Sequence, residues 1–315
     1  MIGEEAWRYD VDHAWAKVPA GKRFGYTHGV VEDREGRIYI ANQSLDAIMV
    51  FAPDGTFLNS WGAEFERGAH GLTIAEENGR EVLYLANTEL AEVVKTTLDG
   101  RVLWRRGAPD LPAYADGRTY SPTETAVAPD GRVYVADGYG QSYIHVYDAD
   151  GTYRTSFGGL GDGEQDLNGS HGISIDPRGR EPVVQVADRN HFRVVSFDLD
   201  GRFLGVLLEA PDVRFPCTTV HARGYVYVPD LFSRVSIFDR DNRKVADLGD
   251  YFDGDGPATW DEIVRRLEGY PNIPHERRYP EKFISPHSLW VDGNDDIFVV
   301  EWIEEGRVTK LTKRA

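Results

Sequence analysis

Residues 27–43, THGVVEDREGRIYIANQ, contain the pattern that decides the fold of this chain. A short apolar stretch leads into a polar turn with a glycine, and a strand-like run follows that ends in Ala-Asn. Two strand-sized runs joined by such a turn are the signal of a β-hairpin. The stretch therefore predicts two adjacent antiparallel strands.

The same pattern recurs five more times along the 315-residue chain. The further copies are AHGLTIAEENGREVLYLANT (69–88), PTETAVAPDGRVYVADGY (122–139), SHGISIDPRGREPVVQVADR (170–189), PCTTVHARGYVYVPDLF (216–232) and PHSLWVDGNDDIFVVEW (286–302). A third alternating run follows each copy, and the first five copies continue into a fourth run. Four strands repeated about every 40–50 residues are what a β-propeller needs. We therefore expect an all-β, six-bladed β-propeller.

The sixth copy is one strand short, because the given sequence stops after its third run at 307–314. Residues 7–18, WRYDVDHAWAKV, supply a spare strand before the first copy. Pairing the two would close the ring and remove an exposed sheet edge. We expect one propeller domain over residues 1–315, its last blade closed by the N-terminal strand.

One insertion interrupts the period at about residues 250–285, which are rich in Gly, Pro and charged residues. Within it, TWDEIVRRL (259–267) predicts a short helix with Thr259 as its N-cap. Long insertions between regular elements often form lids, binding loops or partner contacts, and the alternative is a surface decoration.

The amino-acid composition argues against several kinds of partner and location. With 52 acidic against 35 basic residues, the net charge of −17 argues against a nucleic-acid or anionic-membrane partner. Cys217 is the single cysteine, so no intrachain disulfide forms. The start has no signal-peptide pattern, and no apolar run is long enough to span a membrane. We expect a cytoplasmic protein with a small-molecule substrate, and a protein partner remains an alternative.

Alignment of the six copies at the first residue of the innermost strand gives a column that holds four histidines. The column reads His28, His70, Thr123, His171, Cys217 and His287. The second, fourth and sixth copies all supply histidine, and alternate blades are evenly spaced around the axis of a six-bladed ring. Three neutral imidazoles that converge in this way, with one position left open, are typical of catalytic zinc.

We therefore predict that His70, His171 and His287 bind Zn²⁺ or Fe²⁺. His28 is a candidate fourth ligand or second-sphere base, or it only lines the channel. The alternative for all four histidines is a water-filled channel with polar walls.

The second strand of each copy runs antiparallel to the first, so its end returns to the face that carries the histidines. Tyr139 and Arg189 at these ends are groups able to transfer a proton and to hold an anion. The acids Asp137, Asp188 and Asp230 at equivalent positions are expected to tie the turns between strands.

At these residues the chain resembles the NHL-repeat propellers, and within them the catalytic core of peptidyl-α-hydroxyglycine α-amidating lyase. The likeness is distant and covers roughly residues 20–315. Its most specific parts are DGYGQS (137–142) and ADRNHFRV (187–194). The resemblance implies that the tyrosine and arginine of these two motifs line an active site, and that three histidines from alternate blades bind zinc.

What the resemblance implies is a metal-dependent lyase that splits a carbinolamide-like substrate into an amide and an aldehyde. Tyr139 would be the general base, and Arg189 would orient a carboxylate or carbonyl. His28 has no counterpart in the family and is a further catalytic candidate from its place in the histidine column. Two positions depart from the family. Gln43 stands where the family has a second arginine, and Ser288 replaces an acid tied to a structural Ca²⁺.

Two other functions stay open. A lactonase would use a calcium ion with carboxylate and amide ligands, for which Glu301, Asn42 and Asn87 are candidates. A non-enzymatic binding module is the third alternative. The sequence contains neither a G-x-S-x-G elbow nor a P-loop, so serine hydrolysis and nucleotide hydrolysis have no support.

Overall fold

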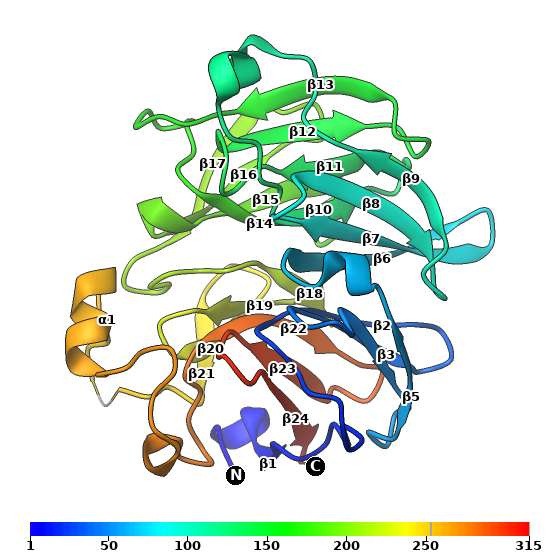
Figure 1. Ribbon diagram of the computed structural model, residues 1–315. Coiled ribbons are helices and arrows are strands. Elements are labelled where there is room, and N and C mark those ends of the chain that lie inside the picture. Colours follow the sequence, from blue (N-terminus) through cyan, green and yellow to red (C-terminus); the bar gives the residue numbers. More distant parts are fainter. Residues whose placement is uncertain (253, 315) are drawn as a thin grey trace.

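The computed structural model describes residues 1–252 and 254–314. These residues form six antiparallel sheets of four strands each, arranged as a β-propeller (Figure 1). The innermost strands of neighbouring blades contact one another around the ring. The predicted all-β, six-bladed architecture is confirmed.

The strands follow the repeats closely. The first blade contains β2 (Thr27–Glu32), β3 (Ile38–Asn42), β4 (Ile48–Phe51) and β5 (Phe57–Trp61). The second contains β6 (Ala69–Glu77), β7 (Arg80–Asn87), β8 (Glu92–Thr97) and β9 (Val102–Arg106). The third contains β10 (Glu124–Val127), β11 (Val133–Ala136), β12 (Tyr143–Tyr147) and β13 (Tyr153–Gly158).

The remaining blades repeat this order. The fourth contains β14 (Ser170–Asp176), β15 (Val183–Asp188), β16 (Arg193–Phe197) and β17 (Phe203–Glu209). The fifth contains β18 (Val220–Ala222), β19 (Tyr225–Asp230), β20 (Arg234–Phe238) and β21 (Lys244–Leu248). The sixth contains β22 (Pro286–Val291), β23 (Ile297–Glu301), β24 (Arg307–Lys313) and β1 (Tyr9–Asp12). Short 3-10 helices are η1 (Glu5–Trp7), η2 (Ala63–Phe65), η3 (Pro112–Gly117), η4 (Arg189–His191) and η5 (His275–Arg277).

The N-terminal strand closes the sixth blade as predicted. Strand β1 pairs antiparallel with β24, with Tyr9 opposite Lys313 and Asp12 opposite Lys310. The two chain ends therefore lie side by side (Figure 1). Closure of this kind leaves no unpaired edge between the first and last repeats.

The apolar core is divided into layers between neighbouring blades. Tyr39 and Ile48 of the first blade pack with Leu83 and Leu85 of the second, for example. Because each sheet is covered on both faces, every residue of β3 and β4 is buried. The outermost strand β5 is partly exposed. Removal of this apolar surface from water, worth about 25 cal/mol per Å², is the main force that holds the ring together.

The insertion lies between β21 and β22 and contains α1 (Trp260–Arg266). The Thr259 hydroxyl accepts a hydrogen bond from the backbone N–H of Glu262 at 3.2 Å, so the predicted N-cap is confirmed. Ile263 and Leu267 are buried in a cluster with Phe215 and other residues of the fifth and sixth blades. The insertion is thus packed onto the ring. In the described residues, no helix is long and apolar enough to cross a bilayer.

Candidate functional site

Each histidine of the column lies at a β-bulge at the start of an innermost strand. The registers shift between Thr27 and Gly29, Ala69 and Leu72, Ser170 and Gly172, and Pro286 and Ser288. A bulge inserts an extra residue and turns its side chain away from the regular alternation. The four histidines of the predicted column thus share the same backbone irregularity, which repeats from blade to blade. Thr123 and Cys217 lie just before β10 and β18 instead of within them.

The glycines that follow three of these histidines allow neighbouring blades to approach closely. A Cβ on Gly71 would lie 2.5 Å from the Thr123 carbonyl oxygen, and one on Gly172 would lie 2.2 Å from that of Cys217. No real Cβ contact is that short, so only glycine fits at these two positions. The recurring His-Gly pair thus combines a channel side chain with a tight contact between blades.

The four imidazoles converge on one place in the channel, and all four are buried. The His70 ring centroid is 4.5 Å from that of His28 and 5.0 Å from that of His171. The His287 centroid lies 4.6, 4.7 and 4.8 Å from those of His28, His70 and His171. The structure brings together all three predicted metal ligands and adds His28 to the cluster.

Backbone carbonyls of other blades orient the three predicted ligands. The Nδ1 atoms of His70, His171 and His287 lie 2.7, 2.8 and 2.9 Å from the carbonyl oxygens of Thr123, Cys217 and His28. A carbonyl only accepts, so each Nδ1 carries the proton and each Nε2 presents a lone pair. This outer hydrogen bond is the usual support of a metal-binding histidine.

Burial keeps the cluster neutral. Desolvation lowers the pKa of His28 to about 3 and holds the pKa of each of the other three rings well below its ordinary value. Neighbouring rings and the Arg189 cation act in the same direction. Neutral imidazoles are the metal-binding form, so protons do not compete for these nitrogens at neutral pH.

His28 differs from the other three in its support. Its Nδ1 lies 3.1 Å from the Tyr26 carbonyl of its own blade. Among the described residues, two sets have candidate ligand atoms that all lie within 4.8 Å of one another. They are His28, His70 and His287, and His171, Cys217 and His287. The predicted trio is split between these sets, which share His287. Burial raises the pKa of the Cys217 thiol to about 12, so this side chain is a neutral thiol at neutral pH.

The Tyr139 hydroxyl bridges two of the histidines. It lies 3.0 Å from Nε2 of His171 and 3.3 Å from Nε2 of His70. Because both Nε2 atoms are acceptors, the hydroxyl is the donor in this contact. The predicted catalytic tyrosine is therefore in direct contact with the metal-binding candidates.

Arg189 lies beside this tyrosine. Its guanidinium carbon is 5.4 Å from the centre of the Tyr139 ring and 5.0 Å from that of Phe215. No carboxylate among the described residues lies within ion-pairing distance of this cation. Its buried Nε has no hydrogen-bond partner in the described structure. A largely buried cation without a counterion favours an anionic ligand.

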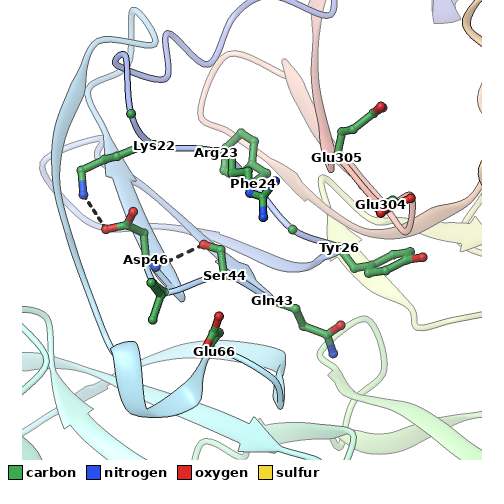
Figure 2. Close-up of a pocket in the computed structure, with 13 residues that line it drawn as sticks. Lys22, Arg23, Phe24, Tyr26, Gln43, Ser44, Asp46, Glu66, Glu304 and Glu305 are labelled. Carbon is green, nitrogen blue, oxygen red and sulfur yellow. Dashed lines mark hydrogen bonds and ion pairs between the residues drawn. The ribbon is translucent and has the colours of Figure 1, made fainter.

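These groups open into a cavity of about 350 Å³ at the mouth of the channel. The residues that line it are Tyr139, Arg189, Asn190, Phe215, Leu231, Trp260, His287 and Trp302. A larger hollow of about 640 Å³ lies beside the first blade (Figure 2). Gln43 lines this hollow, and Lys22 pairs there with Asp46 at 2.5 Å. Tyr26, which lines this hollow, packs against Trp302, which lines the mouth cavity, with 5.4 Å between the ring centroids.

Further along the channel, the innermost strands of all six blades enclose a cavity of about 280 Å³. Ser288 and Glu124 both line this cavity. Burial raises the pKa of Glu124 to about 8. The inner channel therefore holds a protonated carboxyl group at neutral pH.

The acids and amides at the ends of the second strands have structural roles. Asp137, Asp188 and Asp230 accept backbone N–H groups of Ser121, Asn168 and Arg214 at 2.7, 2.7 and 2.5 Å. The three candidate calcium ligands of a lactonase are engaged in the same way. Asn42, Asn87 and Glu301 accept the N–H groups of Gly25, Leu90 and Ile284 at 3.0, 3.0 and 2.7 Å.

Sequence reasoning missed the apolar wall of the mouth cavity. Trp302 directly follows the strand-end acid Glu301, so the sequence could have predicted that it lies on the same face as the histidines. Phe215 precedes the fifth repeat and Trp260 is in the insertion, outside the repeat pattern that located the other residues. Their place at the site follows only from the packing of α1.

Comparison with known proteins identifies an NHL-repeat homologue. No protein-family model matches the chain. The chain is 27% identical over 223 residues to NHL repeat-containing protein 3 from Homo sapiens. That match covers 64% of this chain and 61% of the relative, so it spans less than two thirds of the relative's length.

Solved structures with the same fold include enzymes. A catalytically inactive virginiamycin B lyase from Staphylococcus aureus matches with a TM-score of 0.59 and 10% identity, covering 97% of this chain and 99% of the other. A gluconolactonase from Xanthomonas campestris matches with a TM-score of 0.64 and 13% identity, covering 98% and 91%. At such low identities these likenesses show the fold alone.

Proposed function

We propose that this protein is a metal-dependent lyase that cleaves a small carbinolamide-like substrate at the mouth of the propeller channel. The observation that carries the proposal is the arrangement of His70, His171 and His287. Their Nδ1 atoms are occupied by backbone carbonyls, and the Nε2 atoms of His70 and His171 lie beside the Tyr139 hydroxyl.

The donor set fits a transition metal. Neutral imidazole nitrogens suit Zn²⁺ and Fe²⁺, whereas Ca²⁺ requires oxygen ligands. Among the four histidines, we assign His70, His171 and His287 as ligands because they share the same support from a neighbouring blade. When bound, such an ion supplies Lewis-acid stabilisation of charge on a substrate oxygen.

Tyr139 and Arg189 then have distinct tasks. Arg189, whose Nε–H has no partner among the described residues, holds a carboxylate or carbonyl of the substrate. Tyr139 is the general base that takes the proton of the substrate hydroxyl. The carbon–nitrogen bond breaks, a carbonyl forms at the former hydroxyl carbon, and the amide nitrogen gains a proton. An amide and an aldehyde leave, and no oxidant or water is consumed.

The observations favour this function over a calcium-dependent lactonase. A gluconolactonase shares the fold, but the candidate oxygen ligands Asn42, Asn87 and Glu301 already accept backbone N–H groups. The neutral, desolvated histidines are a poor calcium site. If the experiment below detects no turnover, the result would favour a non-enzymatic binding module.

The test is the release of glyoxylate from N-benzoyl-α-hydroxyglycine by the purified protein loaded with Zn²⁺ or Fe²⁺. We expect turnover that is lost on chelation and restored by the metal. Tyr139→Phe should lower kcat by about 10²- to 10⁴-fold, the usual contribution of a positioned acid or base, with unchanged metal content. Undiminished turnover after complete removal of metal, or no turnover by the loaded protein, would overturn the proposal.

A further inference from the structure

The mouth cavity has two chemically different sides. Arg189 forms the cationic side, and no aspartate or glutamate is among the described residues that line the cavity. Phe215, Leu231, Trp260 and Trp302 form the other side. A ligand that satisfies both sides needs an anionic group and an apolar group on one small skeleton.

The apolar side is a continuous aromatic surface. The Phe215 ring centroid lies 6.2 Å from that of Trp260, which lies 6.3 Å from that of Trp302. Phe215 also stacks on Phe232 with an interplanar angle of 8°. The Trp260 side of this surface is open, because that residue is 39% exposed. Exposed indole faces of this kind favour aromatic and branched aliphatic groups.

The insertion holds this surface in place. Trp260 is the first residue of α1, whose Ile263 is fully buried in the cluster that contains Phe215 and Leu231. The Tyr270 hydroxyl donates to the Leu231 carbonyl at 2.6 Å. Asn272 donates to the Tyr26 hydroxyl at 2.9 Å. The wall is thus preformed by packing and hydrogen bonds and needs no ordering when a ligand arrives.

The volume gives the size of the part of a ligand that the cavity can hold. A cavity of about 350 Å³ has the volume of about a dozen water molecules. This is the size of one amino acid with a small acyl group. Arg189 touches Phe215, so a carboxylate bound to the guanidinium would bring the remainder of such a ligand against the aromatic surface.

We infer that the insertion is a specificity element that selects amino-acid-sized carboxylates bearing an aromatic or branched apolar acyl group, with the carboxylate on Arg189 and the apolar group on Trp260 and Trp302. The inference rests on the proposed function for the reacting carbinolamide, because it names the substrate class of that same site. The recognition itself is independent of catalysis and is measured separately.

The test uses calorimetric binding of three unreactive probes to the chelator-treated full chain. N-benzoylglycine carries both groups, N-acetylglycine lacks the ring and N-benzoylglycinamide lacks the charge. We expect N-benzoylglycine to bind at least about 10-fold more tightly than either of the others, as burial of a ring predicts. Trp260→Ala should remove most of the advantage of the ring, and Arg189→Gln should remove that of the charge.

Val264→Ala is the matched control, because Val264 is on α1, is 41% exposed and does not line the cavity. This variant should bind all three probes like the native chain. Trp260→Leu, checked for an unchanged thermal transition, replaces Trp260→Ala if the latter fails to fold. Equal affinity for N-acetylglycine and N-benzoylglycine, or an unchanged preference in the Trp260 variants, would overturn the inference.

The two proposals fail in different ways. Selective binding of N-benzoylglycine without turnover of its α-hydroxy derivative would remove the lyase and leave the specificity element. Turnover of N-acetyl- and N-benzoyl-α-hydroxyglycine with equal kcat/KM, together with unselective binding, would leave the lyase and remove the specificity element.

Discussion

Two sets of polar side chains surround the mouth of the channel at equivalent positions of the repeat, and they differ in what their hydrogen-bonding atoms do. The strand-end acids and amides accept backbone N–H groups in every blade, as Asp230 does from Arg214 and Phe215. The clustered histidines use one ring nitrogen for a backbone carbonyl and leave the other toward the channel, as His171 does with Cys217.

This difference in hydrogen bonding distinguishes side chains that stabilise the repeats from side chains that can bind a ligand. The strand-end set is buried and its main hydrogen-bonding capacity is spent inside the fold. The histidine set is equally buried, but in the described residues no backbone group uses the Nε2 atoms of His70, His171 and His287, and two of these atoms face the Tyr139 hydroxyl in the channel. Both sets are buried and both recur in the repeats. The candidate site is distinguished by side-chain atoms that are still able to bind a ligand.

The largest expected effect comes from Asp230→Ala. The carboxylate of Asp230 accepts three backbone N–H groups, those of Arg214, Phe215 and Phe232. Buried donors left without a partner cost about 1–3 kcal/mol each, so we expect a loss of about 4 kcal/mol in the free energy of unfolding. Chemical denaturation of the metal-free protein measures it. Asp241→Ala, which removes a surface ion pair with Arg243, should cost less than about 1 kcal/mol. Equal losses in the two variants would break the comparison.

The repeat pattern explains why the fold was predictable. The alternating runs, the Gly-containing turns and the spare strand at 7–18 each correspond to an observed element, because they report local strand and turn preferences. The convergence of His70, His171 and His287 followed from symmetry. His28 belongs to the same column, so its place near that group also followed from the repeat, but the sequence left its role open between ligand, base and channel residue. Trp260 was not predictable as part of the site, since its position depends on the packing of a non-repetitive insertion.

Glu124→Gln tests the channel beyond the histidines and has the second-largest expected effect. Glu124 directly follows the Thr123 position of the histidine column, and the one backbone N–H that it accepts is that of its neighbour Thr125. The native pKa of about 8 is above the value of about 4.3 for an unfolded glutamate. Between these values the native state binds more protons than the unfolded state, so stability falls as pH rises.

The free energy of unfolding measured from pH 5 to pH 8 should therefore fall in the native chain by about 2 kcal/mol relative to Glu124→Gln. This is less than the full shift would give, because the side chain is only partly shielded from water. Below pH 5 the difference should level off, since both states of the native chain then bind the proton. Parallel pH profiles for the two proteins would contradict the assignment of a protonated carboxyl group.

His28→Ala has the smallest expected effect and sharpens the comparison within the histidine cluster. The His28 ring is 4.5 Å from that of His70, yet its Nδ1 is supported only by its own blade. We expect the variant to retain the metal with an affinity lowered by less than about 10-fold, or about 1.4 kcal/mol. Competition with a chromophoric chelator measures this affinity. A complete loss of metal would place His28 among the ligands and favour the set His28, His70 and His287.

The most direct test of the account is the metal content per chain of the native protein and of three variants, His70→Ala, His171→Ala and His287→Ala. The measurement is elemental analysis after saturation with Zn²⁺ or Fe²⁺ and removal of excess ion, with the surface variant Asp241→Ala as a folded control outside the cluster. The account predicts about one bound ion in the native and control proteins and none in the three histidine variants. A correctly folded native protein that binds no ion, or histidine variants that retain it, would contradict the account.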